Sequence, residues 1–208
     1  MEELITLINQ LKKSEIKLLV DQRIKEFEEL GKKNSSELFK ELCFCLLTAN
    51  FSASGGMKIQ KEIGDEFFTL SEQELAKKLS DLGHRFPNTR AKYIFEARKC
   101  KDSLKEVLSS FESEAEARNW LVKNIKGLGM KEASHLLRNI GYKNLAILDF
   151  HILDLLESYG LINRPKTLNP KSYIEIENVL RKVSEKSNTN LGELDLYLWY
   201  KETGKILK

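Results

Sequence analysis

The chain has 208 residues, 41% of them hydrophobic, which is enough to build one large or two small domains with a substantial core. No uncharged run approaches the roughly 18 residues of a membrane span, and the opening Met1-Glu2-Glu3 lacks the cationic head of a signal peptide. We therefore expect a cytoplasmic protein that does not enter a membrane. The net charge is only +3, so binding to a polyanion would depend on a local basic face.

The cysteine content limits the metal and redox chemistry. Three cysteines, Cys43, Cys45 and Cys100, are too few for a four-cysteine iron–sulfur cluster. In a cytoplasmic chain they also predict no disulfide. Cys43 and Cys45 flank Phe44 within an apolar run, which is typical of thiols packed in a core. We predict no metal site.

The first half of the chain is predicted to be a succession of helices. Residues 3–30 carry a helical or two-helix pattern that ends at Gly31. Asn34-Ser35-Ser36 caps a helix that is apolar almost all round by residue 47 and ends at Asn50. Further helices are predicted from Met57 to Phe68, from the capping box of Ser71 and Glu74 to about Leu82, and from Asn88 or Thr89 to about Ala97.

Two helices with a very short link follow. Ser113 to Ile125 opens with a capping box and keeps helical spacing of its apolar residues. Met130 to Ile140 carries its apolar residues on one side and is closed by Gly141. Gly127 and Gly129 lie in the link. They allow a sharp turn and are expected to leave amide N–H groups bare at the next helix start, which is a site for an anion such as a phosphate. The alternative is a tight turn with no ligand.

The remainder of the chain is also predicted to be helical. Leu145-Ala146-Ile147-Leu148 leads to Asp149 and a helix to Ser158, and the last two helices are expected over residues 172–184 and 191–203. No segment alternates for long enough to be a convincing strand. The sequence therefore predicts an all-α protein of roughly ten helices.

The link and its surroundings resemble a known signature. Lys131 follows Gly129 by two residues, and Asp149 follows Lys131 by 18. This pattern is similar to the helix–hairpin–helix plus Gly-Pro-Asp signature of the DNA glycosylases that include endonuclease III and the 8-oxoguanine glycosylases. Asp149-Phe150-His151 also resembles the Asp-x-His of the 8-oxoguanine branch. Lys126 replaces the family's hairpin proline, a departure that leaves both glycines in place.

The resemblance covers essentially the whole chain and points to the archaeal-type 8-oxoguanine glycosylases. It implies a single glycosylase module over residues 1–208 with two helical subdomains and an active-site cleft between them. The central subdomain would span residues 35–141 and contain the hairpin at 114–140. Residues 1–34 and 142–208 would together form the terminal subdomain.

The resemblance also implies the two catalytic residues. Lys131 would attack the sugar C1′ of a flipped nucleotide, release the base and leave a Schiff base that permits β-elimination. Asp149 would stabilise positive charge on the sugar and could accept a proton. The alternatives are an exposed first-turn lysine and a plain helix cap. Capping by Asp149 is compatible with its catalytic role, since it fixes the carboxylate.

Three residues are expected to form the base pocket. His135 lies four residues after Lys131 and shares its helix face. In relatives the corresponding residue forms one wall, and an aromatic residue on the last helix, here Trp199, forms the other. Lys208 would bring its main-chain carboxylate to the flipped base. Trp199 as a plain core residue and a frayed terminus at Lys208 are the alternatives.

Four further residues are expected to contact DNA besides Gly127 and Gly129. Asn50 corresponds to the asparagine that enters the gap left by the flipped base, and it could instead simply close its helix. Arg85 and Phe86 correspond to the loop that wedges into the duplex, with an exposed arginine and a loop-covering aromatic as the alternatives. His151 corresponds to a phosphate contact, and could otherwise be a surface histidine.

The sequence thus predicts a bifunctional DNA glycosylase that excises 8-oxoguanine from duplex DNA and cleaves the abasic strand. One alternative is an endonuclease III-like glycosylase for oxidised pyrimidines. Another is a hairpin DNA-binding module without enzymatic activity. The expected partner is double-stranded DNA containing 8-oxoguanine, and we expect a monomer. No cofactor is expected, apart from a monovalent cation that could bind at the hairpin together with DNA.

Overall fold

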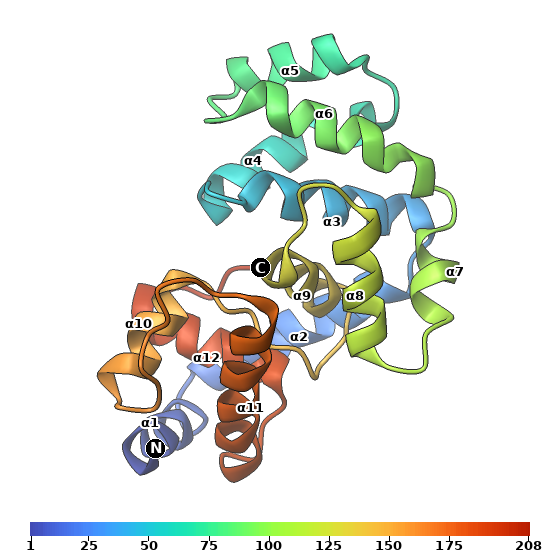
Figure 1. Ribbon diagram of the computed structural model, residues 1–208. Coiled ribbons are helices and arrows are strands. Elements are labelled where there is room, and N and C mark those ends of the chain that lie inside the picture. Colours follow the sequence, from blue (N-terminus) through green and yellow to red (C-terminus); the bar gives the residue numbers. More distant parts are fainter.

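The computed structural model describes residues 1–208 as twelve α-helices and two short 3-10 segments, with no strand (Figure 1). The prediction of an all-α chain is confirmed, although the number of helices is higher than expected. None of the helices combines the length and apolar character that crossing a membrane requires. The helices are α1 (Glu2–Leu11), α2 (Ile16–Lys32), α3 (Ser35–Thr48), α4 (Ala53–Ile63), α5 (Glu72–Asp81), α6 (Pro87–Ala97), α7 (Leu104–Ser109), α8 (Glu114–Asn124), α9 (Met130–Asn139), α10 (Phe150–Ser158), α11 (Pro170–Lys186) and α12 (Leu191–Thr203), with 3-10 segments at Gly64–Phe68 and Arg98–Cys100.

Local sequence signals set most helix ends. The capping boxes predicted at Ser71 and Ser113 are both present, each with the glutamate three residues later. The Asn34 side chain accepts a hydrogen bond from the backbone N–H of Glu37 at 3.1 Å and starts α3. Gly204 takes the left-handed conformation, with φ +69°, and closes α12 at Thr203 as expected.

Three predicted helix starts were wrong by a few residues. The helix predicted from Met57 begins at Ala53, because the Ser52 hydroxyl accepts a hydrogen bond from Gly55 N–H and caps it. Prolines occupy the first turn of α6 and of α11, where the missing N–H costs nothing, so these helices begin at Pro87 and Pro170.

Gly31 was expected to end the first helical pattern, and this was also wrong. It lies inside α2, one residue before the last. A Cβ built on Gly31 would lie 2.1 Å from the carbonyl oxygen of Ile140, at the end of α9. The glycine therefore serves a close backbone approach between two helices that are distant in sequence.

The hydrophobic core has two parts. One cluster of 28 buried residues draws on residues 38–145, and a second cluster of 20 draws on residues 4–27 and 146–198. The chain thus leaves the terminal cluster, builds the other, and returns. In Figure 1 helices α3 to α6 form the upper part, whereas α1, α10, α11 and α12 lie below. The division into subdomains at residues 35 and 142 stays a prediction. The distribution of the two core clusters along the chain supports it, except that Leu145, which follows the predicted boundary, packs in the first cluster.

A buried ion pair connects the two parts. Arg118 on α8 pairs with Glu177 on α11, and its second nitrogen contacts the other carboxylate oxygen at 3.1 Å. Glu177 also accepts a hydrogen bond from the backbone N–H of Ala146 at 2.9 Å. Both side chains of the pair are at most 5% exposed. A bidentate pair of this kind fixes orientation as well as distance, so it holds the helices of the hairpin against the terminal helices.

Candidate active site

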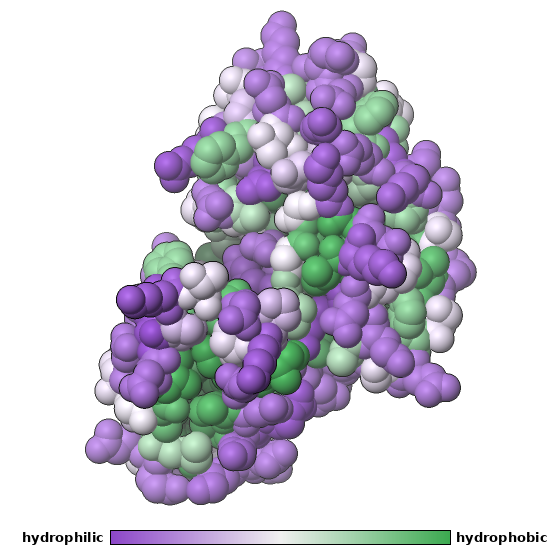
Figure 2. Space-filling model, viewed as in Figure 1, coloured by the Kyte–Doolittle hydropathy of each residue, from purple (hydrophilic) through white to green (hydrophobic).

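A cleft of about 820 Å³ opens between the two parts of the molecule. Figure 2 shows the hollow on the side where the upper and lower halves meet. Residues from both parts of the molecule and from the C-terminal tail line it. The 21 lining residues are Thr48, Asn50, Phe51, Ser52, Ala53, Ser54, Arg85, Lys131, Glu132, His135, Arg138, Ile147, Asp149, Phe150, His151, Asp195, Trp199, Thr203, Lys205, Leu207 and Lys208.

Most of the residues singled out from the sequence meet in this cleft, although they come from segments far apart in the chain. Those that line it are Lys131, Asp149, His135, Trp199, Lys208, Asn50, Arg85 and His151. Gly127, Gly129 and Phe86 do not line it. The two glycines belong to the hairpin, and Phe86, which is 37% exposed, lies on the surface beside Arg85.

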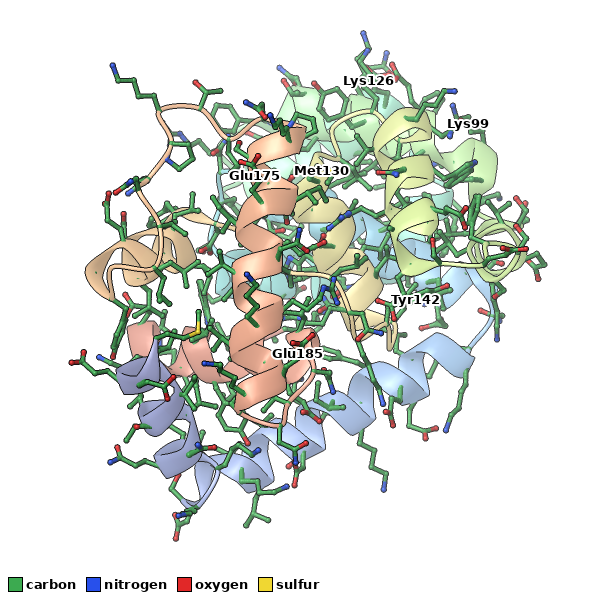
Figure 3. All side chains as sticks on the ribbon, turned by 60° about the horizontal axis from the view of Figure 1, so that its bottom comes forward. Lys99, Lys126, Met130, Tyr142, Glu175 and Glu185 are labelled. Atoms are coloured by element: carbon green, nitrogen blue, oxygen red, sulfur yellow. The ribbon has the colours of Figure 1, made fainter.

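The two glycines of the hairpin are not equivalent. Gly127 has φ +92°, and a Cβ there would lie 2.2 Å from the ring of Tyr93 on α6. Gly129 has φ −91° and caps α9 in an extended conformation that other residues can adopt. Figure 3 labels Lys126 at the turn between α8 and α9, and Met130 at the start of α9. Only Gly127 is therefore required by backbone geometry.

The expectation of bare amides at this helix start needs a correction. The N–H of Gly129 donates to the carboxylate of Glu132 at 3.2 Å, so the protein supplies its own anion there. The N–H groups of Met130 and Lys131 donate to no protein acceptor. The sequence reading had missed Glu132, although a glutamate at the third position of a helix is the usual signal for this contact.

Lys131 and Asp149 are both half-buried, at the starts of different helices. The Lys131 side chain is 26% exposed, and its Nζ lies 3.7 Å from the Glu132 carboxylate. Asp149 caps α10, where its carboxylate accepts a hydrogen bond from Ile152 N–H at 2.9 Å. The predicted cap is thus confirmed. It fixes the direction of the carboxylate, which faces the same cleft as Lys131.

His135 forms a buried part of the cleft. Its ring packs edge-on against Phe44, with centroids 5.6 Å apart. Burial lowers the pKa of His135 well below its usual value, and the charges of Arg138, Lys131 and Lys208 lower it further. Its Nδ1 has no hydrogen-bond partner in the protein. His135 is therefore a neutral imidazole in the wall of the cleft, with one ring nitrogen buried and without a partner.

Trp199 and Lys208 also line the cleft. Trp199 is half-buried and belongs to neither core cluster, so it is not a plain core residue. Its ring stands edge-on to that of His151, with centroids 5.3 Å apart. Lys208 is not frayed, because its Nζ contacts the carboxylate of Glu41 at 2.7 Å. Four residues thus suffice to carry the chain from α12 back to α3.

His84, which sequence reasoning missed, connects the loop of Arg85 to the last turn of α3, which precedes Asn50. The His84 Nε2 lies 2.9 Å from the carbonyl oxygen of Leu47, and Nδ1 accepts a hydrogen bond from Phe86 N–H at 3.0 Å. The ring is buried, which lowers its pKa. Asn50 itself has φ +59°, so the reading as a left-handed helix end is correct for its backbone.

Comparisons with known proteins agree on one family. Residues 20–189 match the model of the family described as 8-oxoguanine DNA glycosylase. The 8-oxoguanine DNA glycosylase/AP lyase of Korarchaeum cryptofilum is 54% identical over 208 residues, covering 100% of this chain and 99% of the relative. The Methanocaldococcus jannaschii 8-oxoguanine glycosylase/lyase, solved with a 15mer DNA containing 8-oxoguanine, has a TM-score of 0.97 at 55% identity and covers 99% of this chain and 100% of its own.

The chain belongs to the 8-oxoguanine DNA glycosylase family. The 8-oxoguanine DNA glycosylase of Thermotoga maritima also matches over 100% of this chain and 99% of its own, with 47% identity and a TM-score of 0.94. The prediction of a DNA glycosylase with abasic-site lyase activity is thereby confirmed. A complex of endonuclease III with DNA shares only 19% identity at a TM-score of 0.56, over 89% of this chain and 83% of that one, and shows the fold alone.

This member of the 8-oxoguanine glycosylase family has a buried polar group in the cleft that sequence reasoning did not find. Arg138 on α9 pairs with Asp195 on α12, and its Nε donates to the Asn139 side chain at 3.1 Å. Burial and the nearby Asp149 raise the pKa of Asp195 to about 6, although the Arg138 charge opposes this. Nothing in the spacing of residues 138 and 195 could have revealed this pair, because the contact joins two separate helices.

Proposed function

We propose that the chain excises 8-oxoguanine from duplex DNA and then cleaves the abasic strand. In the first step, Nζ of Lys131, as the free amine, forms a bond to C1′ of a flipped nucleotide. The glycosidic bond breaks, and its electron pair leaves with the base, which takes up a proton. The sugar ring opens to a Schiff base on Lys131. Loss of a C2′ proton then expels the 3′ phosphate by β-elimination.

The observation that carries this proposal is the meeting of Lys131 and Asp149 in one cleft. Asp149, fixed by its cap, would stabilise the positive charge that develops on the sugar. The amine and the carboxylate supply the chemistry, so the proposed reaction uses no cofactor. A monovalent cation could bind at the hairpin when DNA is present.

The base itself would lie between His135 and Trp199. 8-Oxoguanine carries a donor N–H at N7, where guanine has a bare acceptor. The terminal carboxylate of Lys208 would accept this N–H and would face the lone pair of guanine unfavourably. Such a mismatch costs about 1–3 kcal/mol. The placement of Lys208 in the cleft supports this assignment.

The remaining residues would hold the DNA. Asn50 would fill the gap left by the flipped base, and Arg85 and Phe86, which stack on one another, would wedge into the duplex. His151 would contact a phosphate. At the hairpin of Gly127 and Gly129, the free amides of Met130 and Lys131 would contact another phosphate. The molecule would act as a monomer.

The test is a panel of duplexes that each carry one defined base, together with borohydride trapping. We expect release of 8-oxoguanine, little release of guanine, and a trapped covalent adduct. The Lys131→Gln variant should form no adduct while it still binds lesion DNA, because the amine is lost at similar size. An adduct in that variant would contradict the assignment of Lys131. Stronger release of thymine glycol than of 8-oxoguanine would indicate an endonuclease III-like specificity.

A further inference from the structure

The C-terminal tail is held by the side chain of its last residue. The Lys208 ammonium donates to the Glu41 carboxylate at 2.7 Å and to the Gln60 amide oxygen at 2.5 Å. It also stands 4.2 Å from the ring centroid of Phe44. The Lys208 side chain is only 16% exposed. Three groups on α3 and α4 thus enclose an ammonium that would otherwise be free in solvent.

The acceptors are buried and already oriented by other contacts. Glu41 is 2% exposed, and its Oε1 accepts a hydrogen bond from the Asn139 amide at 2.6 Å. The Gln60 amide nitrogen donates to Glu41 Oε2 at 3.1 Å and to the carbonyl oxygen of Lys40 at 2.9 Å. This fixes the amide so that its oxygen is turned toward the tail. The remaining acceptor sites of Glu41 and Gln60 therefore suit a cation.

The charge balance makes this contact specific. A buried carboxylate is unfavourable unless a cation compensates it. Lys208 is the one cation that forms an ion pair with Glu41 in this structure. Because the ammonium and the terminal carboxylate belong to the same residue, fixing the first restricts where the second can lie. The Lys208 main chain also adjoins His135, in the wall of the cleft.

We propose that Glu41 and Gln60 form a socket for the C-terminal lysine side chain, and that this socket positions the terminal carboxylate for discrimination between 8-oxoguanine and guanine. The inference rests on the proposed function, in which that carboxylate reads N7. Glu41 and Gln60 are positioning residues that do not touch the substrate. Besides the socket, the residues after Gly204 are held by the packing of Ile206 against the second core cluster and by a hydrogen bond from Lys205 N–H to Thr203.

The test uses the full chain with Glu41→Gln, Lys208→Met and the double variant. In E41Q the amide oxygen can still accept from Asn139, whereas its NH₂ group opposes the donors of Lys208 and Gln60. We expect each single variant to lower the ratio of 8-oxoguanine release to guanine release by about tenfold. Cleavage of a preformed abasic site by E41Q should stay within about twofold. The double variant should discriminate no worse than the poorer single variant, because both changes break one contact.

Two controls and a second readout complete the design. Glu37→Gln removes the same charge one turn earlier on α3, where the side chain is 36% exposed and pairs with Lys40. Lys201→Met changes an exposed residue of α12 and removes no contact of the tail. Both should behave like the parent. Hydrogen exchange of residues 204–208 measures tail order without any activity, and it should become faster in E41Q and K208M. Unchanged exchange in both variants would overturn the socket.

The two levels of the proposal can fail separately. If the tail loosens in E41Q and K208M but both discriminate as well as the parent, the socket does not set specificity and the inference is wrong. If the parent itself releases no 8-oxoguanine, the proposed function is wrong, while hydrogen exchange still decides whether Glu41 holds the tail.

Discussion

The α8–α9 hairpin and the C-terminal tail lie at the same cleft, but opposite kinds of contact determine their local conformation. Contacts within a few residues shape the hairpin: the Ser113 capping box, the positive φ of Gly127, and the bond from Gly129 N–H to Glu132. The tail is held by Lys208 through partners that lie 148 and 167 residues away.

This difference separates two tasks. The hairpin and the cap of α10 present Lys131 and Asp149, which would carry out the proposed bond-breaking chemistry. The tail presents groups that would distinguish one base from another. Locally held groups should therefore control whether reaction occurs at all, and the distant contacts of the tail should control which base is chosen.

The largest effect is expected at Asp149. In Asp149→Asn the amide oxygen can still cap α10, but the negative charge is lost. Base release should fall by roughly 10²-fold or more, because the variant lacks the negative charge that would stabilise the positive charge developing at C1′ in the transition state. Single-turnover excision measures this, and far-ultraviolet circular dichroism checks the fold. A fall of under about threefold, which is below 1 kcal/mol of barrier, would mean that Asp149 is only a cap.

The two hairpin glycines should differ in their tolerance. Gly127→Val places a branched side chain at φ +92° and against Tyr93. We expect the resulting strain to lower the free energy of unfolding by more than about 2 kcal/mol. It should weaken binding to damaged and undamaged duplexes alike. Gly129→Ala should cost under about 1 kcal/mol, because φ there is ordinary. Binding at constant salt and thermal unfolding provide the comparison, and equal behaviour of both variants would contradict it.

At the tail, two changes separate the carboxylate from the side chain. Appending two glycines moves the carboxylate but keeps the Lys208 ammonium in its socket, whereas deleting Lys208 removes both. Each should lower selectivity for 8-oxoguanine over guanine by about tenfold, which corresponds to 1.4 kcal/mol. Abasic-site cleavage should be nearly unchanged. If both variants select as well as the parent, the tail does not read the base, and carbonyl groups near Asn50 or Phe51 become the candidates.

The smallest effect concerns His135 and pH. Its pKa is lowered in the folded protein, so the unfolded chain binds the extra proton first. The stability contribution is therefore complete above about pH 6.5, the unfolded value, and is lost as the pH falls below it. His135→Gln should reduce this decline of the unfolding free energy between pH 7 and 5. His84 changes the pH dependence of stability in the same direction as His135, and Asp195 changes it in the opposite direction. The quantity to compare at each pH is therefore the difference in unfolding free energy between parent and variant, measured by chemical denaturation. An unchanged slope would mean that His135 is not buried neutral.

The sequence by itself determined the features that depend on near neighbours. Capping residues and apolar spacing predicted helices such as α3, α5, α8 and α12 nearly to their ends, because a helix end is decided by which side chain can satisfy its free amides. Lys131 and Asp149 were singled out because the motif that they resemble fixes their spacing. The sharp turn between α8 and α9 was also expected, from two glycines in so short a link.

Only the tertiary structure decided the features that depend on distant neighbours. Gly31 had to remain a glycine inside a helix because Ile140 approaches it, and no local pattern reports this. Glu41 and Arg138 are ordinary charges on their own helices, and acquire a partner only when α3, α9, α12 and the tail come together. A buried charge must be compensated, but the partner can come from anywhere in the chain, and which one arrives is set by packing.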